Sequence, residues 1–208
     1  MNFFTATNKP GRRFFKFADQ NNVAVSHGHK SGICFGLCVE WILEQAAEYY
    51  SQQYIKSAER TAARMASNYS SFKDIAVQIT NAQEASKEAF ENLVSATFRK
   101  FSLTPHADLE VCFTSNQIAS AVCNHSKKGY FIIGLYDKVN SADDFGSGHA
   151  IAVDAYEYSI FDPNVGEAYF EDLETLWNVV NTWISEEYSQ YKLPYPTSIT
   201  RVTSPNNW

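Results

Sequence analysis

The sequence predicts an α+β fold in which helices come first and an antiparallel sheet follows. Apolar residues recur at helical spacing between about residues 33 and 101. From Leu109 onward, short apolar runs bounded by turn residues replace that spacing, as expected for strands. An amphipathic helix is expected near the end, over about residues 171–188. Helices followed by strands are typical of α+β proteins, whereas regular alternation would indicate a parallel sheet.

Length and composition are those of one globular domain over residues 1–208. Hydrophobic residues make up 45% of the chain and charged residues 19%. We expect an irregular N-terminal segment over 1–30, a mainly helical lobe over 31–125 and a sheet lobe over 126–208. The formal net charge of -6, with no run of basic residues, argues against nucleic acid as a partner.

Four cysteines in 208 residues are too few for a disulfide scaffold. The first ten residues lack the apolar core of a signal peptide. The longest apolar run, residues 130–136, is far shorter than the ~20 residues that span a bilayer. We therefore expect no transmembrane segment and no Sec-type export, while export without a cleavable signal stays open.

The first predicted helix covers about residues 33–50 and follows the dipeptide Ser31-Gly32. Its apolar face contains positions 34, 37, 38, 41, 42 and 45, of which Gln45 alone is polar.

Two further helices are predicted over about 54–80 and 83–101. Their stripes are Ala58, Ala62, Met65, Tyr69, Phe72, Ala76 and Ile79, and then Phe90, Leu93, Val94, Thr97, Phe98 and Phe101. The stripes either dock a partner helix or are buried within a helical lobe. We favour burial, because so few heptads are marginal alone.

The second half is expected to hold a short helix over 116–123 and a series of strands. The predicted strands are 130–136, 149–155, 158–162 and 168–170, with an edge strand over 198–203. The helix over 171–188 places Leu173, Leu176, Trp177, Val180, Trp183 and Ile184 on one face.

Cys34 is a candidate nucleophile because it lies at the predicted start of a helix. The helix dipole and the unpaired N–H groups there lower a thiol pKa, and the thiolate is the reactive form. The alternative is a buried structural cysteine, as we interpret Cys38 one turn further on. A zinc site of Cys34 and Cys38 with His27 and His29 matches no common ligand spacing, so we expect no metal and no cofactor.

A thiolate nucleophile needs a base, and His149 is the candidate. It begins a predicted strand directly after the glycine-flanked residues 146–148, so its ring can face a cleft. The alternative is a core histidine that is satisfied by a backbone group.

Asp162 is the candidate that orients this histidine. A hairpin that turns at Tyr156-Glu157 pairs Ala155 with Tyr158 and Ile151 with Asp162. His149 and Asp162 are then diagonal neighbours on one sheet face, about 7–8 Å apart at Cα, and their side chains can meet. An aspartate there would hold the ring and stabilise its imidazolium form. The alternative is that Asp162 belongs to a simple turn signal, Asp162-Pro163-Asn164, which ends the strand.

Three segments together resemble the YopT/AvrPphB-type cysteine proteases, which are bacterial effectors of the papain-like clan. The segments are 32–41 (GICFGLCVEW), 148–153 (GHAIAV) and 161–167 (FDPNVGE). The resemblance covers about residues 30–175 in the family order of Cys, His and Asp. It implies a papain-like fold, in which a helical lobe carrying the nucleophile packs against a sheet carrying His and Asp.

By that resemblance Cys34, His149 and Asp162 are the catalytic triad. It further implies a protease that is delivered into a host cell, without a Sec signal, and that cleaves a host protein in the cytoplasm. A secretion chaperone or an immunity protein is a further candidate partner. The family's oxyanion side chain precedes the cysteine; here the nearest residues are His29 and Lys30, neither of them an amide, and His29 is the candidate. The Cys34 backbone N–H is the other candidate donor.

Two rival interpretations remain open from the residues. The same triad serves peptidoglycan amidases, transglutaminases and acyltransferases. A catalytically inactive effector would instead bind its target through the helical stretch 54–101.

Overall fold

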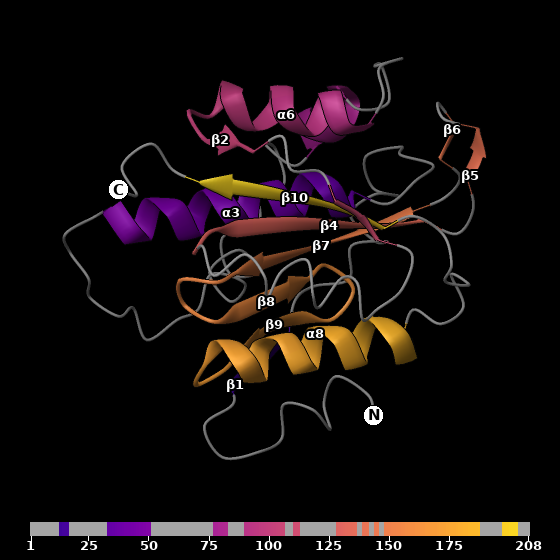
Figure 1. Cartoon of the computed structure of the whole chain (residues 1–208). Helices are drawn as coiled ribbons and strands as arrows, with labels where there is room; N and C mark the ends of the chain where they lie inside the picture. Colours follow the sequence, from indigo (N-terminus) through magenta and orange to yellow (C-terminus); the bar gives the residue numbers. More distant parts are fainter. Residues whose placement is uncertain are drawn as a thin grey trace.

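The computed structural model describes residues 13–16, 33–50, 77–82, 90–106, 110–112, 128–136, 139–141, 144–145, 148–187 and 197–203. They form one antiparallel sheet with helices on both of its faces, and a separate small hairpin (Figure 1). This is the predicted α+β class, with a helix preceding the sheet.

The main sheet has eight strands in the order β1-β9-β8-β7-β4-β10-β2, and β3 also pairs with β10. Every pairing in it is antiparallel. The strands are β1 (Arg13–Lys16), β2 (Thr104–Pro105), β3 (Glu110–Cys112), β4 (Tyr130–Tyr136), β7 (Gly148–Asp154), β8 (Ser159–Asp162), β9 (Gly166–Tyr169) and β10 (Thr197–Thr203). The small hairpin joins β5 (Val139–Ser141) and β6 (Asp144–Phe145).

The central strands are those that the sequence predicts most closely. The structure confirms β4 over the predicted residues and β7 and β8 within one residue at each end. These strands are apolar on both faces because helices cover both sides of the sheet, so continuous apolar runs mark them. β9 begins two residues before its predicted start and ends one residue earlier.

Two predictions about the outer parts of the sheet are wrong. β10 is not an edge strand, because it pairs with β4 on one side and with β2 and β3 on the other. Its residues Ile199, Thr200 and Val202 are accordingly buried. The segment 1–30 is not irregular throughout, since Arg13–Lys16 form β1 against β9. A strand as short as β1 has little periodicity of its own, and it forms because β9 offers an edge for pairing.

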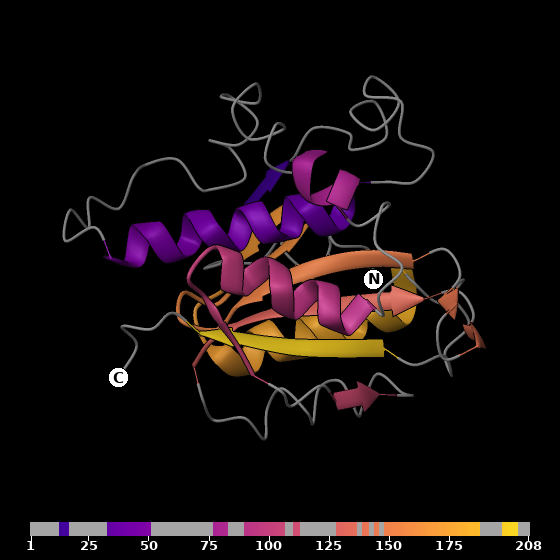
Figure 2. The same ribbon diagram turned by 90° about the horizontal axis from the view of Figure 1, so that it is seen from above.

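Helices cover the two faces of the sheet. On one side lies α3 (Cys34–Tyr50), with α6 (Phe90–Lys100) beside it, and on the other lies α8 (Leu173–Glu187). Figure 2, seen from above, shows α3 and α8 separated by the strands. The faces alternate along β7: Ala150 and Ala152 pack toward α3, whereas Ile151 and Val153 pack toward α8.

The described helical stripes are buried in the chain's own core. Val94 and Phe98 of α6 and Ile79, in a helical stretch at 77–82, pack with α3, and Phe101 is partly buried against them. On α8, Leu176, Trp177, Val180 and Ile184 pack against the opposite sheet face. The remainder of the predicted helices over 54–76 and 83–89, and the helix over 116–123, lie outside the described residues.

The division into a helical and a sheet lobe stays a prediction, although β1, β2 and β3 join the sheet from the first 125 residues. Among the helices that the structure describes, none is long and apolar enough to cross a membrane.

Candidate active site

Cys34 is the first residue of α3, as predicted. The helix begins where the N–H of Leu37 donates to the carbonyl of Ile33. Ile33, Leu37 and Trp41 are fully buried and anchor this end of the helix in the core. The first turn contains no acidic residue, so its N–H groups and the positive end of the dipole act on the thiol without a competing carboxylate.

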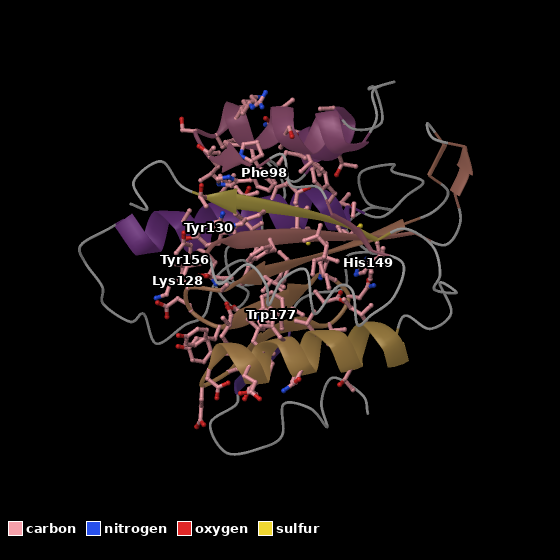
Figure 3. The ribbon with its side chains drawn as sticks, viewed as in Figure 1. Phe98, Lys128, Tyr130, His149, Tyr156 and Trp177 are labelled. Carbon is pink, nitrogen blue, oxygen red and sulfur yellow. The ribbon has the colours of Figure 1, made fainter. Side chains whose placement is uncertain are left out.

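The hairpin of β7 and β8 has the predicted register. Ala152 pairs with Phe161, Val153 with Ile160 and Asp154 with Ser159. The connecting turn spans residues 155–158. Because the loop has the predicted parity, His149 and Asp162 lie on one face at the same end of the two strands. Figure 3 shows His149 at the end of the sheet remote from Tyr130 and Tyr156.

His149 and Asp162 are in direct contact. The ring Nε2 of His149 lies 3.0 Å from Oδ1 of Asp162, and both side chains are buried. The same Oδ1 accepts the backbone N–H of Asn164 at 2.6 Å, which holds the carboxylate in a tight turn. That turn ends at Gly166, whose φ of 140° favours glycine.

Cys34 hydrogen-bonds to the same imidazole. Since Nε2 faces Asp162, the nitrogen left for the thiol is Nδ1. Helix α3 and strand β7 are packed together, so residues far apart in sequence meet here. The three side chains therefore form a chain of contacts from the thiol through the imidazole to the carboxylate.

Burial and pairing oppose each other in the pKa values of this pair. Burial alone raises the pKa of Cys34, but the hydrogen bond and positive charge of His149 outweigh it and leave the pKa lowered. Burial alone lowers the pKa of His149, but the charge and hydrogen bond of Asp162, with a contribution from Cys34, raise it from 6.5 to about 10. Both directions favour a thiolate–imidazolium pair near neutral pH.

The second cysteine of the helix has a different environment. The thiol of Cys38 donates to the backbone carbonyl of Ala150 at 3.3 Å. Burial, followed by the charges of Cys34 and Asp162, raises its pKa well above 9.0. Cys38 therefore stays a protonated core thiol that joins α3 to β7, as the sequence indicates.

Other candidates lie outside the described residues: His29 and Lys30 for the oxyanion site, His27 for zinc, and the residues 146–147 before β7. Within the described ranges, no group of three or more His, Cys, Asp or Glu side chains is placed to hold a metal ion. The catalytic roles of Cys34, His149 and Asp162 stay a prediction, which their contacts make testable.

Sequence reasoning missed three groups at this site. The backbone of Ala150 and that of Phe35 both hydrogen-bond to the Cys34 sulfur. The side-chain amide of Asn164 lies 3.4 Å from Nε2 of His149. The Asp-Pro-Asn turn signal marked Asn164 as a turn residue. A single sequence carries no signal that its side chain contacts His149.

The arrangement can perform nucleophilic acyl chemistry. It supplies a nucleophile with a lowered pKa, a base and acid in contact with it, and a carboxylate that orients the base. The backbone N–H groups at the start of α3 lie beside the nucleophile, where a developing oxyanion needs donors.

Comparisons with known proteins support the family and the fold that the sequence predicts. Residues 9–201 match the family model Peptidase_C58, described as Yersinia/Haemophilus virulence surface antigen. The structure is similar to the crystal structure of the Pseudomonas avirulence protein AvrPphB, with a TM-score of 0.58 and 18% identity, covering 89% of this chain and 96% of that chain. At that identity the likeness shows the fold alone, which is papain-like. No curated protein matches the chain.

Proposed function

The chain belongs to the Peptidase_C58 family, and on that premise we propose that it is a cysteine endopeptidase that cleaves a host protein as a bacterial virulence effector. The contact chain from Cys34 through His149 to Asp162 is the observation that carries the proposal. Family membership supports a cysteine peptidase of a virulence type; the triad and the host substrate are what we add.

The reaction begins with the thiolate of Cys34. It attacks the carbonyl carbon of the scissile peptide bond, forming a C–S bond and placing the negative charge on the carbonyl oxygen. The backbone N–H of Cys34 supports this oxyanion, and His29 is the candidate second donor. The oxyanion then collapses, the C–N bond breaks, and Nδ1–H of His149 gives its proton to the leaving amine.

The second half returns the enzyme to its starting state. The neutral imidazole of His149 takes a proton from water, and the hydroxide attacks the thioester carbon. The C–S bond breaks, and Cys34 leaves as a thiolate beside the re-formed imidazolium. Asp162 keeps the ring oriented through both halves and stabilises its charged form.

Membership of a peptidase family implies a protein substrate. Delivery into the host cytoplasm is our proposal, which the description of the family as a virulence antigen supports. A dedicated secretion route and a chaperone for it would follow from that delivery. The scissile bond has to be found by experiment.

The proposal is tested first by covalent labelling with an epoxysuccinyl thiol inhibitor, read by intact mass and peptide mapping. We expect a single adduct on Cys34. Cys34→Ala should abolish it, His149→Ala should slow it at least about a hundredfold, as for loss of a general base, and Cys38→Ala should leave it in place.

Proteolysis itself is tested by mapping new protein N-termini in host-cell lysate after addition of the enzyme. We expect termini that appear with the wild type and are absent with Cys34→Ala and with His149→Ala. Labelling at Cys34 without such termini would point to another triad chemistry, such as amide transfer. Slow labelling spread over several cysteines, indifferent to His149, would overturn the proposal.

A further inference from the structure

Asn164 occupies an unusual place beside the imidazole. Its backbone N–H clamps Asp162 Oδ1 at 2.6 Å, while its side-chain amide reaches back to 3.4 Å from Nε2 of His149. Two side chains therefore converge on one ring nitrogen, since Asp162 Oδ1 lies 3.0 Å from the same Nε2.

The chemistry of the ring decides which end of the amide faces it. Asp162 as a carboxylate accepts hydrogen bonds and cannot donate them, so Nε2 must carry the proton. A protonated ring nitrogen has no lone pair and cannot accept from an NH₂ group. The structure places Nδ2 of Asn164 toward Nε2, but the two ends of an amide are interchanged by a half-turn of the terminal torsion. With the proton on Nε2, a hydrogen bond to Asn164 can form only if the carbonyl oxygen takes that position.

We propose that Asn164 is a positioning residue for the proposed protease reaction, and that its side-chain Oδ1 is a second acceptor for the Nε2–H of His149 beside Asp162. This inference rests on the proposed function of the Cys34–His149 pair. Asn164 touches neither the substrate bond nor the thiol in this role; it acts through the ring.

A second acceptor would do two things for the ring. It would restrict rotation of the imidazole about its bond to Cβ, which keeps Nδ1 aimed at Cys34. Its carbonyl dipole would also favour the imidazolium over the neutral ring. Among the described residues, the charged groups that act on His149 are Asp162 and Cys34, and Asn164 adds a neutral dipole to them. Because Asn164 is exposed, water weakens the effect and the expected shifts are modest.

The backbone part of the contact and the side-chain part can be separated by mutation. Alanine keeps the N–H that clamps Asp162 but removes the side-chain oxygen. Asn164→Asp keeps an acceptor at the same reach and adds a charge. Asn178→Ala, at an exposed position of α8 on the far side of the sheet, is the matched control.

The experiment is the rate of iodoacetamide alkylation at Cys34 as a function of pH, from about pH 4 to about pH 11, read by peptide mapping. The acid limb reports formation of the thiolate–imidazolium pair, and a step at high pH reports loss of the imidazolium proton. Thermal unfolding of each variant is measured alongside, to compare folded proteins.

With Asn164→Ala we expect the high-pH step to move down by roughly half a pH unit or more, and with Asn164→Asp to move up by a similar amount. Asn178→Ala should coincide with wild type. If Asn164 had a purely structural role, its variants would change the unfolding temperature and leave the pH of both steps in place. Alkylation profiles of the Asn164 variants that coincide with that of wild type would therefore overturn the inference. A wild-type profile with one step, near the pKa of a free thiol, would overturn the proposed function itself and the role of Asn164 with it.

Discussion

The indole of Trp41 stacks on the ring of Phe161, with ring centroids 5.7 Å apart and the planes inclined by 12°. Trp41 lies two helical turns from Cys34 on α3, and Phe161 is the residue before Asp162 on β8. Both rings are fully buried. The stack therefore joins the helix that carries the candidate nucleophile to the strand that carries the aspartate.

Truncating this stack should destabilise the protein strongly. Trp41→Ala is expected to lower the free energy of unfolding by about 3–5 kcal/mol, because it opens a cavity between α3 and the sheet. Trp41→Phe should cost much less, because the indole N–H has no hydrogen-bond partner among the described residues and its loss removes a buried unsatisfied donor. Urea unfolding measures both. Equal losses for the two variants would contradict the role of the stack.

Removing the charge of Asp162 should change the titration of the Cys34–His149 pair. In Asp162→Asn the amide oxygen can still accept the N–H of Asn164, but the charge that raises the pKa of His149 to about 10 is gone. The imidazolium should then deprotonate at a lower pH, and the Cys34 thiolate should lose part of its stabilisation. We expect alkylation of Cys34 at about pH 7 to slow by about tenfold or more, as one pKa unit is a factor of ten.

The pH dependence of that rate is the measurement, with Asp172→Asn as control. Asp172 is an exposed aspartate that accepts the N–H of Thr175 at the start of α8. An Asp162→Asn profile identical to that of wild type would mean that Asp162 does not act on the ring.

Asp154, at the opposite end of β7, should make stability depend on pH. It is buried, and burial raises its pKa from 3.8 to about 7, against the lowering effect of the N–H groups of Tyr156 and Glu157. Between about pH 4 and 7 the unfolded chain has released this proton while the folded protein retains it. Stability therefore falls as pH rises through that window, and remains lower above it.

Asp154→Asn should remove this dependence and still accept the two turn N–H groups. The variant should gain stability over wild type as pH rises, by up to roughly 4 kcal/mol at neutral pH, since each pKa unit corresponds to about 1.4 kcal/mol. Urea unfolding at about pH 4.5 and about pH 8 tests it. Glu40, whose pKa burial also raises to about 7, is present in both proteins and cancels in the comparison. A difference between the two proteins that does not grow with pH would contradict the prediction.

Cys38→Ala should separate the two thiols of α3. The change removes the hydrogen bond to Ala150 and leaves a small cavity, so we expect a loss of about 1 kcal/mol in unfolding free energy. Alkylation of Cys34 should stay within about twofold, because Cys38 is protonated and is not part of the reacting pair. A large drop in Cys34 labelling with unchanged stability would mean that Cys38 takes part in the chemistry.

Helix α3 and the strands β4, β7 and β8 were predictable because each has a pattern complete within itself. An apolar face at helical spacing or a continuous apolar run is decided by neighbours in sequence. The contact between His149 and Asp162 was predictable for the same reason, since a short hairpin of known parity places both residues on one face. The resemblance of the three segments pointed to the family and the papain-like fold.

Other features were decided by contacts between residues far apart in the chain. No local sequence pattern indicates which strands pair with β1 and β10. The sequence therefore predicted an irregular segment at β1 and an edge strand at β10. The sequence alone determined which side chains could act as nucleophile, base and orienting acid. The tertiary structure decided that α3 packs on β7, which brings Cys34 to the imidazole. It also decided that the side chain of Asn164, in the turn after β8, reaches Nε2 of that ring. Packing and burial set those distances and the resulting pKa values, and both depend on the whole core rather than on any one segment.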